Sequence, residues 1–276
     1  MLNLERVKLY LNLLRHREGR GAVATLPSIA RGSMHAAEWK SLPLREQRLA
    51  GTNETVSLAP SNPLGAYFDS IAEGRGVWKW MHYFDIYHRH FQKFIGKEVH
   101  VVEVGVYSGG SLGMWKTYFG HGCTVYGIDV EEACLAYQEK RVRIFIGDQA
   151  DRGFWGRFKT QVPDVDILID DGGHLPEQQI ATLEEMLPHI RGGGVYLCED
   201  IHGVHNRFAA YVRGLTDALN ATAQGPGTEL AVTPSPFQRS ISSVHLYPFV
   251  AVIEKAYGPV EQFVAPKHGT EWQPFL

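Results

Sequence analysis

The stretch VHVVEVGVYSGGS, residues 99–111, decides the fold of this chain. Its first part is mostly valine and lacks the regular alternation of polar and apolar side chains that marks a strand with one face in water. A strand of this kind is buried on both faces, which is typical of a parallel sheet covered by helices. The glycines that follow predict a tight turn out of the strand.

Four later segments have the same character. They are TVYGID (124–129), VRIFIGD (142–148), VDILIDD (165–171) and GVYLCED (194–200). Helix-length segments separate them, and this repetition predicts a doubly wound, Rossmann-like α/β fold with a mostly parallel sheet. The segment SISSVHLYPFVAVIEK (240–255) predicts two short strands around Tyr247 and Pro248, a C-terminal β-hairpin on the sheet edge.

Acidic side chains end all five predicted parallel strands. They are Glu103, Asp129, Asp148, Asp170 with Asp171, and Glu199 with Asp200. The carboxyl ends of parallel strands meet at one edge of the sheet, where ligands bind in this class of fold. One such acid is a common helix cap, but a whole rim of them indicates a polyhydroxylated, cationic or metal-containing ligand set.

The turn after the first strand carries glycines at 105, 109 and 110, which let the backbone approach a ligand closely. By itself, such a turn can equally be a device for packing a helix on the sheet. Asp129 strengthens the signal, because an acid at the end of the second strand can accept both ribose hydroxyls. A cofactor that contains a nucleoside is therefore expected.

From about Tyr67 to Lys255 the chain resembles the class I S-adenosylmethionine-dependent methyltransferases. EVGVYSGGS is similar to their first motif, and GDQAD to the segment that flanks the adenine. The resemblance implies that Glu103 and Gly105 lie near the methionine portion and that Asp129 holds the ribose. The cofactor-binding residues it implies are Glu103, Gly105, Tyr107, Ser111, Asp129, Asp148, Gln149 and Asp170.

Five motifs narrow the resemblance further. GGSLGMWKTYF, GDQADRGF, IDDGGH, GGGVYLCED and SSVHLYPFVAVIEK are similar, in this order, to metal-dependent O-methyltransferases of macrolide-antibiotic sugars and to cephalosporin-biosynthesis proteins. The implied reaction is methylation of a hydroxyl on a small molecule in antibiotic biosynthesis. A secondary-metabolite sugar is the first expectation, and a catechol-like or other hydroxylated molecule the second.

Asp171, Glu199 and Asp200 are the candidate metal ligands, because neighbouring strands would bring them together. Oxygen donors without cysteine suit Mg²⁺ or another hard divalent cation. The alternative is that these acids cap helices or accept backbone hydrogen bonds.

His174, three residues after Asp171, is the candidate catalytic base, as in the resembling sugar enzymes. Asp170 is the reserve candidate, or else it is structural or contacts the cofactor. His202 and His205 follow the acid pair and are interpreted as loop histidines; as metal ligands they would instead favour a transition metal.

Two other functions on the same fold stay open. An NAD-dependent oxidoreductase is disfavoured by the glycine spacing, which is not GxGxxG, and by the lack of an evident catalytic group of that class. A non-catalytic nucleoside-binding or scaffolding protein is the third possibility.

The region before the first strand is harder to interpret. Leu4, Val7, Leu11 and Leu14 predict an amphipathic helix over residues 4–14, which could support a homo-oligomer. Residues 22–65 predict a loop-rich lid or partner-contacting arm. Residues 77–95 predict a helix with Trp80, Phe84, Tyr87 and Phe91 on one face, either a core face or, through His82, Tyr83 or Tyr87, a ligand mouth. Residues 1–66 are thus expected to form an arm, and 67–276 the methyltransferase domain.

Composition is ordinary for a soluble globular protein. The 276 residues are 44% hydrophobic and 21% charged, and the net charge of −3 argues against a nucleic-acid partner. No segment reads as a signal peptide or membrane span, so a cytoplasmic protein without a membrane partner is expected. Cys123, Cys134 and Cys198 lack metal-site or disulfide spacing and are expected to be free thiols.

Overall fold

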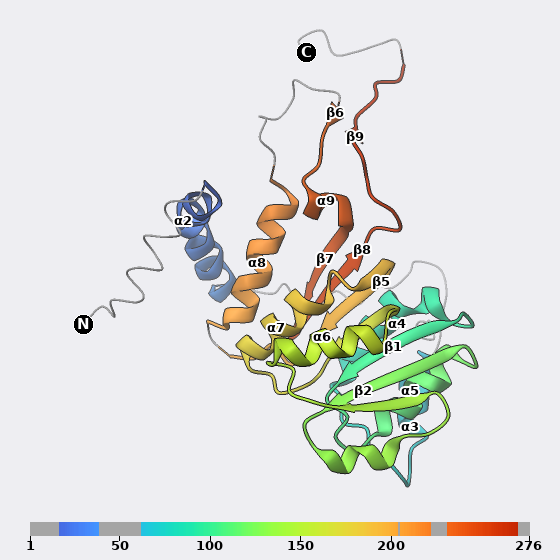
Figure 1. The fold of residues 1–276 in the computed structure, drawn as a ribbon. Coiled ribbons are helices and arrows are strands. Elements are labelled where there is room, and N and C mark those ends of the chain that lie inside the picture. Colours follow the sequence, from blue (N-terminus) through green and yellow to red (C-terminus); the bar gives the residue numbers. More distant parts are fainter. Residues whose placement is uncertain (1–16, 39–61, 204, 222–230, 270–276) are drawn as a thin grey trace, which may run out of the picture. The chain divides into compact units, whose positions relative to one another are not determined.

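The structure, a computed structural model, describes residues 17–38, 62–203, 205–221 and 231–269 (Figure 1). The chain divides into two compact units, Met1–Ser57 and Leu58–Leu276. The helix predicted at 4–14 lies outside the described residues.

The described part of the first unit centres on one helix, α2 (Arg17–Ala37). The prediction of a loop-rich region from residue 22 was therefore wrong as far as residue 37. Pro27 lies inside this helix; there it removes one backbone hydrogen bond, and the nearby alanines favour helix. Residues 39–61 of the predicted loop lie outside the described residues, and its last residues, 63–65, begin helix α3 (Pro63–Asp69) instead of a loop.

A seven-stranded sheet forms the second unit and confirms the predicted fold class. Its strand order is β3-β2-β1-β4-β5-β8-β7, parallel except for the last two strands. The strands are β1 (Val99–Val104), β2 (Cys123–Asp129), β3 (Val142–Ile146), β4 (Val165–Asp170), β5 (Ile190–Cys198), β7 (Ile241–Tyr247) and β8 (Val250–Lys255). The predicted C-terminal hairpin is β7 with β8, at the sheet edge. A separate two-stranded pair joins β6 (Ala231–Val232) to β9 (Phe263–Val264).

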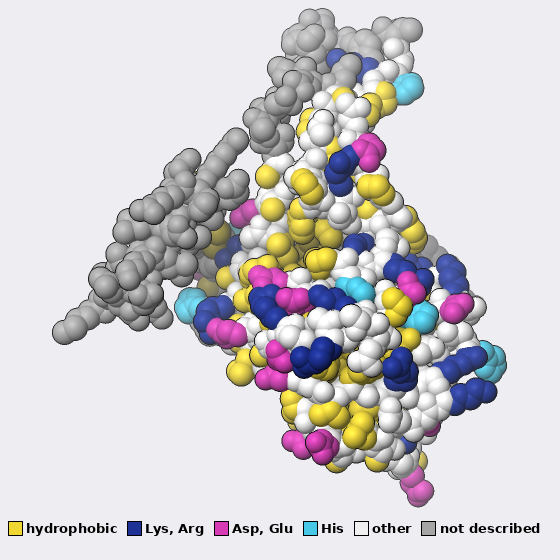
Figure 2. Space-filling model, viewed as in Figure 1, with side chains coloured by type: hydrophobic (Ala, Val, Ile, Leu, Met, Phe, Trp, Pro, Cys, Tyr) yellow, Lys and Arg dark blue, Asp and Glu magenta, His cyan; other side chains and the backbone are white. Residues whose placement is uncertain are grey.

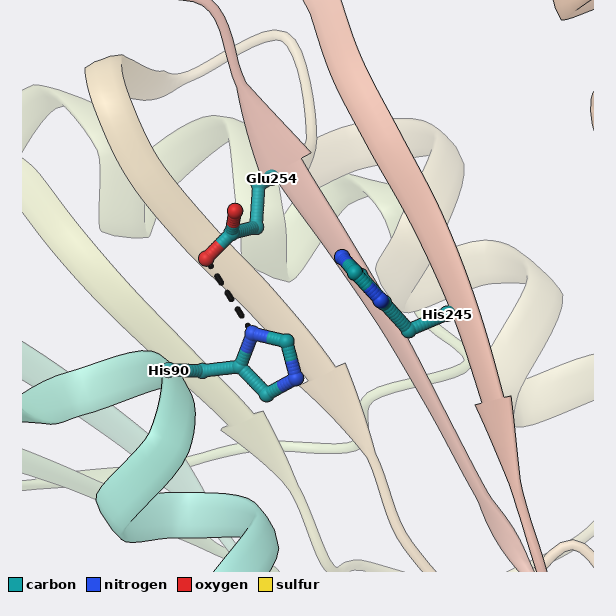
Figure 3. Close-up of side chains that lie close together, drawn as sticks. All are labelled: His90, His245 and Glu254. Atoms are coloured by element: carbon teal, nitrogen blue, oxygen red, sulfur yellow. Dashed lines mark hydrogen bonds and ion pairs between the residues drawn. The ribbon is translucent and has the colours of Figure 1, made fainter.

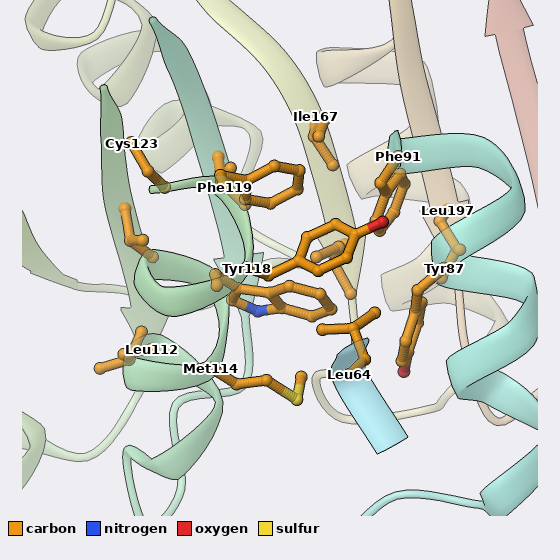
Figure 4. Close-up of a cluster of buried hydrophobic side chains, with 14 of the residues drawn as sticks. Leu64, Tyr87, Phe91, Leu112, Met114, Tyr118, Phe119, Cys123, Ile167 and Leu197 are labelled. Carbon is orange, nitrogen blue, oxygen red and sulfur yellow. The ribbon is translucent and has the colours of Figure 1, made fainter. Parts of the chain in front are cut away.

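Helices cover both faces of the sheet, as two apolar clusters show. On one face are α3 (Pro63–Asp69), α4 (Met81–Phe91) and α5 (Gly110–Phe119); on the other are α6 (Arg152–Gln161), α7 (Pro176–Met186) and α8 (Arg207–Leu219). In Figure 4, side chains of α4 and α5 meet around Leu64 of α3 and contact Ile167 and Leu197 of the sheet. The described part of this unit also contains three short helices: η1 (Gln92–Phe94), η2 (Glu132–Tyr137) and α9 (Pro236–Ser240).

Side-chain caps fix where several helices begin. Asp151 accepts a hydrogen bond from the Gly153 amide at the start of α6. Asn206 does the same for the Ala209 amide at the start of α8. Each cap satisfies an amide that has no partner within its helix, worth ~1 kcal/mol.

The predicted aromatic helix begins later than expected. Helix α4 starts at Met81, and Trp80 before it has an extended backbone with φ −66° and ψ 136°. Phe84, Tyr87 and Phe91 form the predicted buried face, whereas the Trp80 side chain is 51% exposed. Residues 76–80, before α4, thus line a cavity.

The strand order reverses between β1 and β4, which are neighbours in the sheet. From β1 the chain continues outward to β2 and β3, and from β4 it continues in the opposite direction to β5. Val104 of β1 is in register with Asp170 of β4, which is in register with Cys198 of β5. The strands therefore end at one level, and the acids that follow them emerge at one place.

The surface and the cysteines have ordinary features. On the described face in Figure 2, basic and acidic side chains are interspersed.

All three cysteines are buried free thiols, as predicted. None of the helices in the described ranges combines the length and apolar character that a membrane span requires.

Candidate active site

A cavity of about 1070 Å³ opens at the carboxyl edge of the sheet, around the switch point. Its lining includes ten of the residues predicted for the site: Gly105, Tyr107, Ser111, Asp129, Asp148, Gln149, Asp171, His174, Glu199 and Asp200. Glu103 and Asp170 lie behind this lining. The volume exceeds what one small ligand needs, and suits a cofactor together with an acceptor.

Gly105 makes the first turn possible. Its φ is +89°, and a Cβ atom there would collide with the carbonyl oxygen of Asp171. The Gly105 amide donates to the Ile128 carbonyl at 2.8 Å, and the Asp171 amide donates to the Val104 carbonyl at 3.0 Å. The turn is therefore held against both neighbouring strands, and glycine is the residue that fits.

Asp129 organises the other side of this turn. Its Oδ2 accepts the amides of Val106 at 2.9 Å and Tyr107 at 3.1 Å, and its Oδ1 accepts the amide of Glu131 at 3.0 Å. Burial opposes ionisation of this carboxyl, but these hydrogen bonds outweigh it and its pKa lies below the ordinary value. An ionised acceptor thus faces the cavity where the ribose was predicted.

Gln149 is fixed between three groups. Its Nε2 donates to Asp170 Oδ1 at 2.9 Å and to Thr182 Oγ1 at 3.0 Å, while its Oε1 accepts the Gly173 amide at 2.8 Å. Asp170 is 1% exposed, and burial raises its pKa to about 6. The predicted roles of Asp170 as cofactor contact or reserve base do not fit this placement: its carboxylate faces the interior and positions Gln149.

Asp171, His174 and Asp200, here called the outer group, offer donor atoms that all lie within 4.8 Å of one another. His174 Nε2 is 3.7 Å from Asp200 Oδ2. His174 and Asp200 both have positive φ values, 56° and 52°, which is strained backbone for residues with a Cβ. Such strain concentrates at functional sites.

Glu199, the third predicted ligand, lies deeper than the outer group. It is fully buried, and its Oε1 accepts the Tyr87 hydroxyl at 2.6 Å. Burial and the neighbouring charge of Asp171 raise its pKa, although the Lys79 ammonium opposes them. Tyr87 thus supports the site from within the core instead of lining the predicted ligand mouth.

Lys79 was missed by sequence reasoning. Its ammonium lies 2.5 Å from Asp171 Oδ2 and 3.0 Å from Glu199 Oε2. Burial alone would lower its pKa, but the attraction of the surrounding carboxylates prevails and raises it. The only signal in the sequence was a single lysine within the aromatic run VWKWMHYF.

Aromatic side chains surround Asp200 at the mouth of the cavity. Asp200 Oδ1 accepts hydrogen bonds from the Tyr83 hydroxyl at 2.8 Å and from Trp80 Nε1 at 3.1 Å. His202 Nε2 lies 3.1 Å from the same oxygen and also lines the cavity, whereas His205 is outside this lining. The Phe249 ring lies 5.6 Å from Trp80, between centroids. Trp80, Tyr83, His202 and Phe249 are here called the aromatic wall.

The residues present fit both a nucleoside sulfonium cofactor and a hard divalent cation. Glu103 Oε1 is buried without a hydrogen-bond partner, which leaves an acceptor free beside the predicted methionine position, while Oε2 accepts Ser111 Oγ at 2.7 Å. Asp171 and Asp200 supply the oxygen donors that Mg²⁺ prefers. Glu199 fits less directly, because the Lys79 ammonium and the Tyr87 hydroxyl already occupy its oxygens.

A second group with metal-type donors, His90, His245 and Glu254, is a structural network (Figure 3). His90 joins Glu254 Oε1 through Nδ1 at 3.1 Å and the Tyr247 hydroxyl through Nε2 at 2.9 Å. The Lys93 ammonium also contacts Glu254 Oε1, at 3.3 Å. These contacts connect α4 and η1 to the β7–β8 hairpin. Both ring nitrogens of His90 and Oε1 of Glu254 already have partners within the protein.

Comparison with known proteins agrees with this geometry. No protein-family model matches the chain. It is 31% identical over 200 residues to demethylmacrocin O-methyltransferase of Streptomyces fradiae, covering 64% of this chain and 50% of that protein. It is 30% identical over 190 residues to mycinamicin VI 2''-O-methyltransferase of Micromonospora griseorubida, covering 61% and 47%.

A solved structure extends the likeness to the fold. The methyltransferase MycE of the mycinamycin pathway, in complex with Mg, SAH and mycinamycin VI, matches with a TM-score of 0.58 and 27% identity, covering 71% of this chain and 54% of that one. The chain spans about half the length of the curated relatives it matches. By sequence and by fold, it is related to the S-adenosylmethionine-dependent O-methyltransferases that act on macrolide sugars.

Proposed function

We propose that this chain transfers a methyl group from S-adenosylmethionine to a sugar hydroxyl of a macrolide or other polyketide secondary metabolite, with the help of a divalent cation. The observation that carries the proposal is the shared cavity: the glycine turn with Asp129 and the outer group line the same space. Cofactor, cation and acceptor can therefore meet there. The names of two further relatives, which contain a rhamnosyl and an olivosyl group, support a sugar as the acceptor.

The chain's own residues would hold the cofactor by shape and charge. Because Gly105 has no side chain, the backbone of this turn can lie close to the ligand. The ionised Asp129 accepts the ribose hydroxyls. Asp148 and Gln149 line the adenine side, and Asp170 fixes Gln149 in place. Glu103 Oε1 supplies a buried acceptor for the methionine ammonium.

Asp171 and Asp200 would hold the cation, with Glu199 behind them. When bound, S-adenosylmethionine supplies an activated methyl group and the cation supplies positive charge beside the acceptor oxygen. His174 Nε2 takes the hydroxyl proton, which general-base catalysis requires within hydrogen-bond reach of that hydroxyl. The aromatic wall excludes water from the mouth and offers flat apolar surfaces to a sugar.

A methyl-transfer assay tests the proposal, with mycinamicin VI and demethylmacrocin as acceptors. We expect turnover with Mg²⁺ that is lost in excess chelator and restored by added metal. Asp171→Ala and Asp200→Ala should abolish turnover while SAH affinity changes by less than about fivefold. Asp217→Ala, which removes an exposed carboxylate on α8, is the matched control. Full activity in excess chelator contradicts the role of the metal.

Three expectations stay predictions within this proposal. They are a methyltransferase domain at 67–276 with residues 1–66 as a lid or contact arm, a homo-oligomer, and a cytoplasmic location. Light scattering on the purified protein measures its oligomeric state. Activity of a variant that lacks residues 1–57, the first compact unit, tests the role of the arm.

A further inference from the structure

The ammonium of Lys79 lies within the carboxylate cluster of the proposed metal site. It contacts Asp171 Oδ2 at 2.5 Å and both oxygens of Glu199, at 3.2 and 3.0 Å, and it lies 3.9 Å from Glu103 Oε1. The lysine side chain is 3% exposed. It is a fixed internal charge, in contrast to a solvated surface lysine.

Burial explains why a cation is needed at this depth. The side chains of Glu103 and Glu199 are 0% and 1% exposed. Two unpaired carboxylates in such surroundings would be costly, and the cost is offset only by an opposite charge held close to them. Lys79 supplies this charge from the segment that precedes α4.

The lysine divides the predicted ligand set into two parts. Lys79 and the Tyr87 hydroxyl occupy the oxygens of Glu199, while the outer group of Asp171, His174 and Asp200 keeps its donor atoms within 4.8 Å of one another. An ammonium and a divalent cation on the same carboxylate repel each other strongly in a partly dry site. Because the ammonium contacts both oxygens of Glu199, Glu199 serves either Lys79 or the metal, whereas Asp171 meets Lys79 through Oδ2 and keeps its other oxygen for a metal.

We propose that Lys79 is a built-in competitor of the divalent cation: it occupies Glu199 and one oxygen of Asp171, confines the metal to the remaining carboxylate oxygens of Asp171 and Asp200, and so weakens metal binding. The inference rests on the metal site of the proposed function. It assigns Lys79 as a positioning residue that sets metal affinity and ligand choice.

Mn²⁺ is a suitable probe, because the electron paramagnetic resonance signal of the free ion measures binding without any turnover. The proteins are the wild type, Lys79→Met, Glu199→Gln and the double variant. Lys116→Met is the matched control, since Lys116 pairs with Glu139 outside the cavity lining. We expect Lys79→Met to bind Mn²⁺ at least tenfold tighter than the wild type, and Lys116→Met to match the wild type.

Glu199→Gln separates competition from a general charge effect. It should weaken Mn²⁺ binding less than threefold in the wild type but at least tenfold in the Lys79→Met background, where Glu199 becomes available as a ligand. Equal weakening in both backgrounds overturns the inference. So does Mn²⁺ affinity in Lys79→Met that is equal to or lower than in the wild type.

Loss of the buried charge could unfold Lys79→Met in the absence of metal. In that case, the Mn²⁺ concentration that raises its melting temperature reports the same affinity, because a ligand of the native state stabilises by mass action. Lys79→Gln serves as a second, polar variant with the same expectation. Absence of Mn²⁺ binding in every protein, the Lys79 variants included, overturns the metal site itself. Binding by the wild type that is unchanged in both Lys79 variants overturns only the role of Lys79.

Discussion

Replacement of Gly105 by alanine tests the link between the first turn and the site most directly. The added Cβ would meet the carbonyl oxygen of Asp171 and the neighbouring Asp171 carbonyl carbon, at 2.7 Å. Neither atom belongs to a flexible side chain, so the turn and the end of β4 must move apart. Asp171 carries a proposed metal ligand, and Gly105 begins the proposed cofactor turn, so both functions are disturbed together.

The expected magnitude has two parts. A positive φ of +89° costs a residue with a Cβ ~1–2 kcal/mol. Forcing closely packed backbone apart adds ~1–3 kcal/mol. The Gly105→Ala variant should therefore lose about 2–5 kcal/mol of unfolding free energy, which for a domain of this size lowers the melting temperature by about 4–20 °C.

Thermal unfolding and SAH titration calorimetry measure the two consequences. We expect SAH affinity to fall at least tenfold. Gly156→Ala is the matched control, because Gly156 lies in α6 with no atom within 4 Å of its added Cβ; it should gain about 0.5–1 kcal/mol from helix propensity. Wild-type melting temperature and SAH affinity in Gly105→Ala would refute the argument.

Three further predictions concern single side chains. His174→Gln should lower kcat by about 10²–10⁴-fold with SAH affinity unchanged within threefold, and a smaller loss of kcat argues against a base at this position. Tyr87→Phe removes the hydroxyl that donates to buried Glu199 at 2.6 Å and should cost about 1.5–3 kcal/mol in urea denaturation; wild-type stability would count against that contact. The hydrogen bond from His90, with a contribution from Lys93, lowers the pKa of Glu254 to about 2. Because this folded-state pKa lies below the ordinary value of 4.5, its contribution is complete above about pH 4.5 and is lost as the pH falls toward 2. Stability should fall by about 1 kcal/mol over that range after allowance for solvent screening, and Glu254→Gln should remove this component of the acid profile.

The order of the strands along the chain was predictable because its causes are local. Apolar runs of strand length, glycine turns and helix-length intervals are each written in a few consecutive residues. The parallel direction of the strands then brings their carboxyl ends to one edge. This is why Asp129, Asp171 and Asp200 were correctly expected in one cavity.

Two features were harder to predict, the start of α4 and the helix at Arg17–Ala37, because in each case the local sequence pattern pointed to a different structure. The aromatic spacing at positions 80, 84, 87 and 91 fits a helix over the whole run. Trp80 nevertheless has an extended backbone, and its ring packs near Phe249 in the aromatic wall. Pro27 carries a strong breaking signal that the surrounding helix overrides.

By itself, the sequence determined the strand order along the chain, the glycine turn and the ring of acids at one edge of the sheet. Only the tertiary structure decided which of those acids are paired and which are free. Lys79 lies 92 residues from Asp171 and 120 from Glu199 along the chain, and its ammonium reaches both because α4 packs on the sheet directly below them. The same packing puts the Tyr87 hydroxyl on Glu199, whereas Asp170 is buried by contacts with Gln149 and Tyr196. Charge pairing of this kind depends on distances of a few ångströms between distant segments, and no local pattern encodes them.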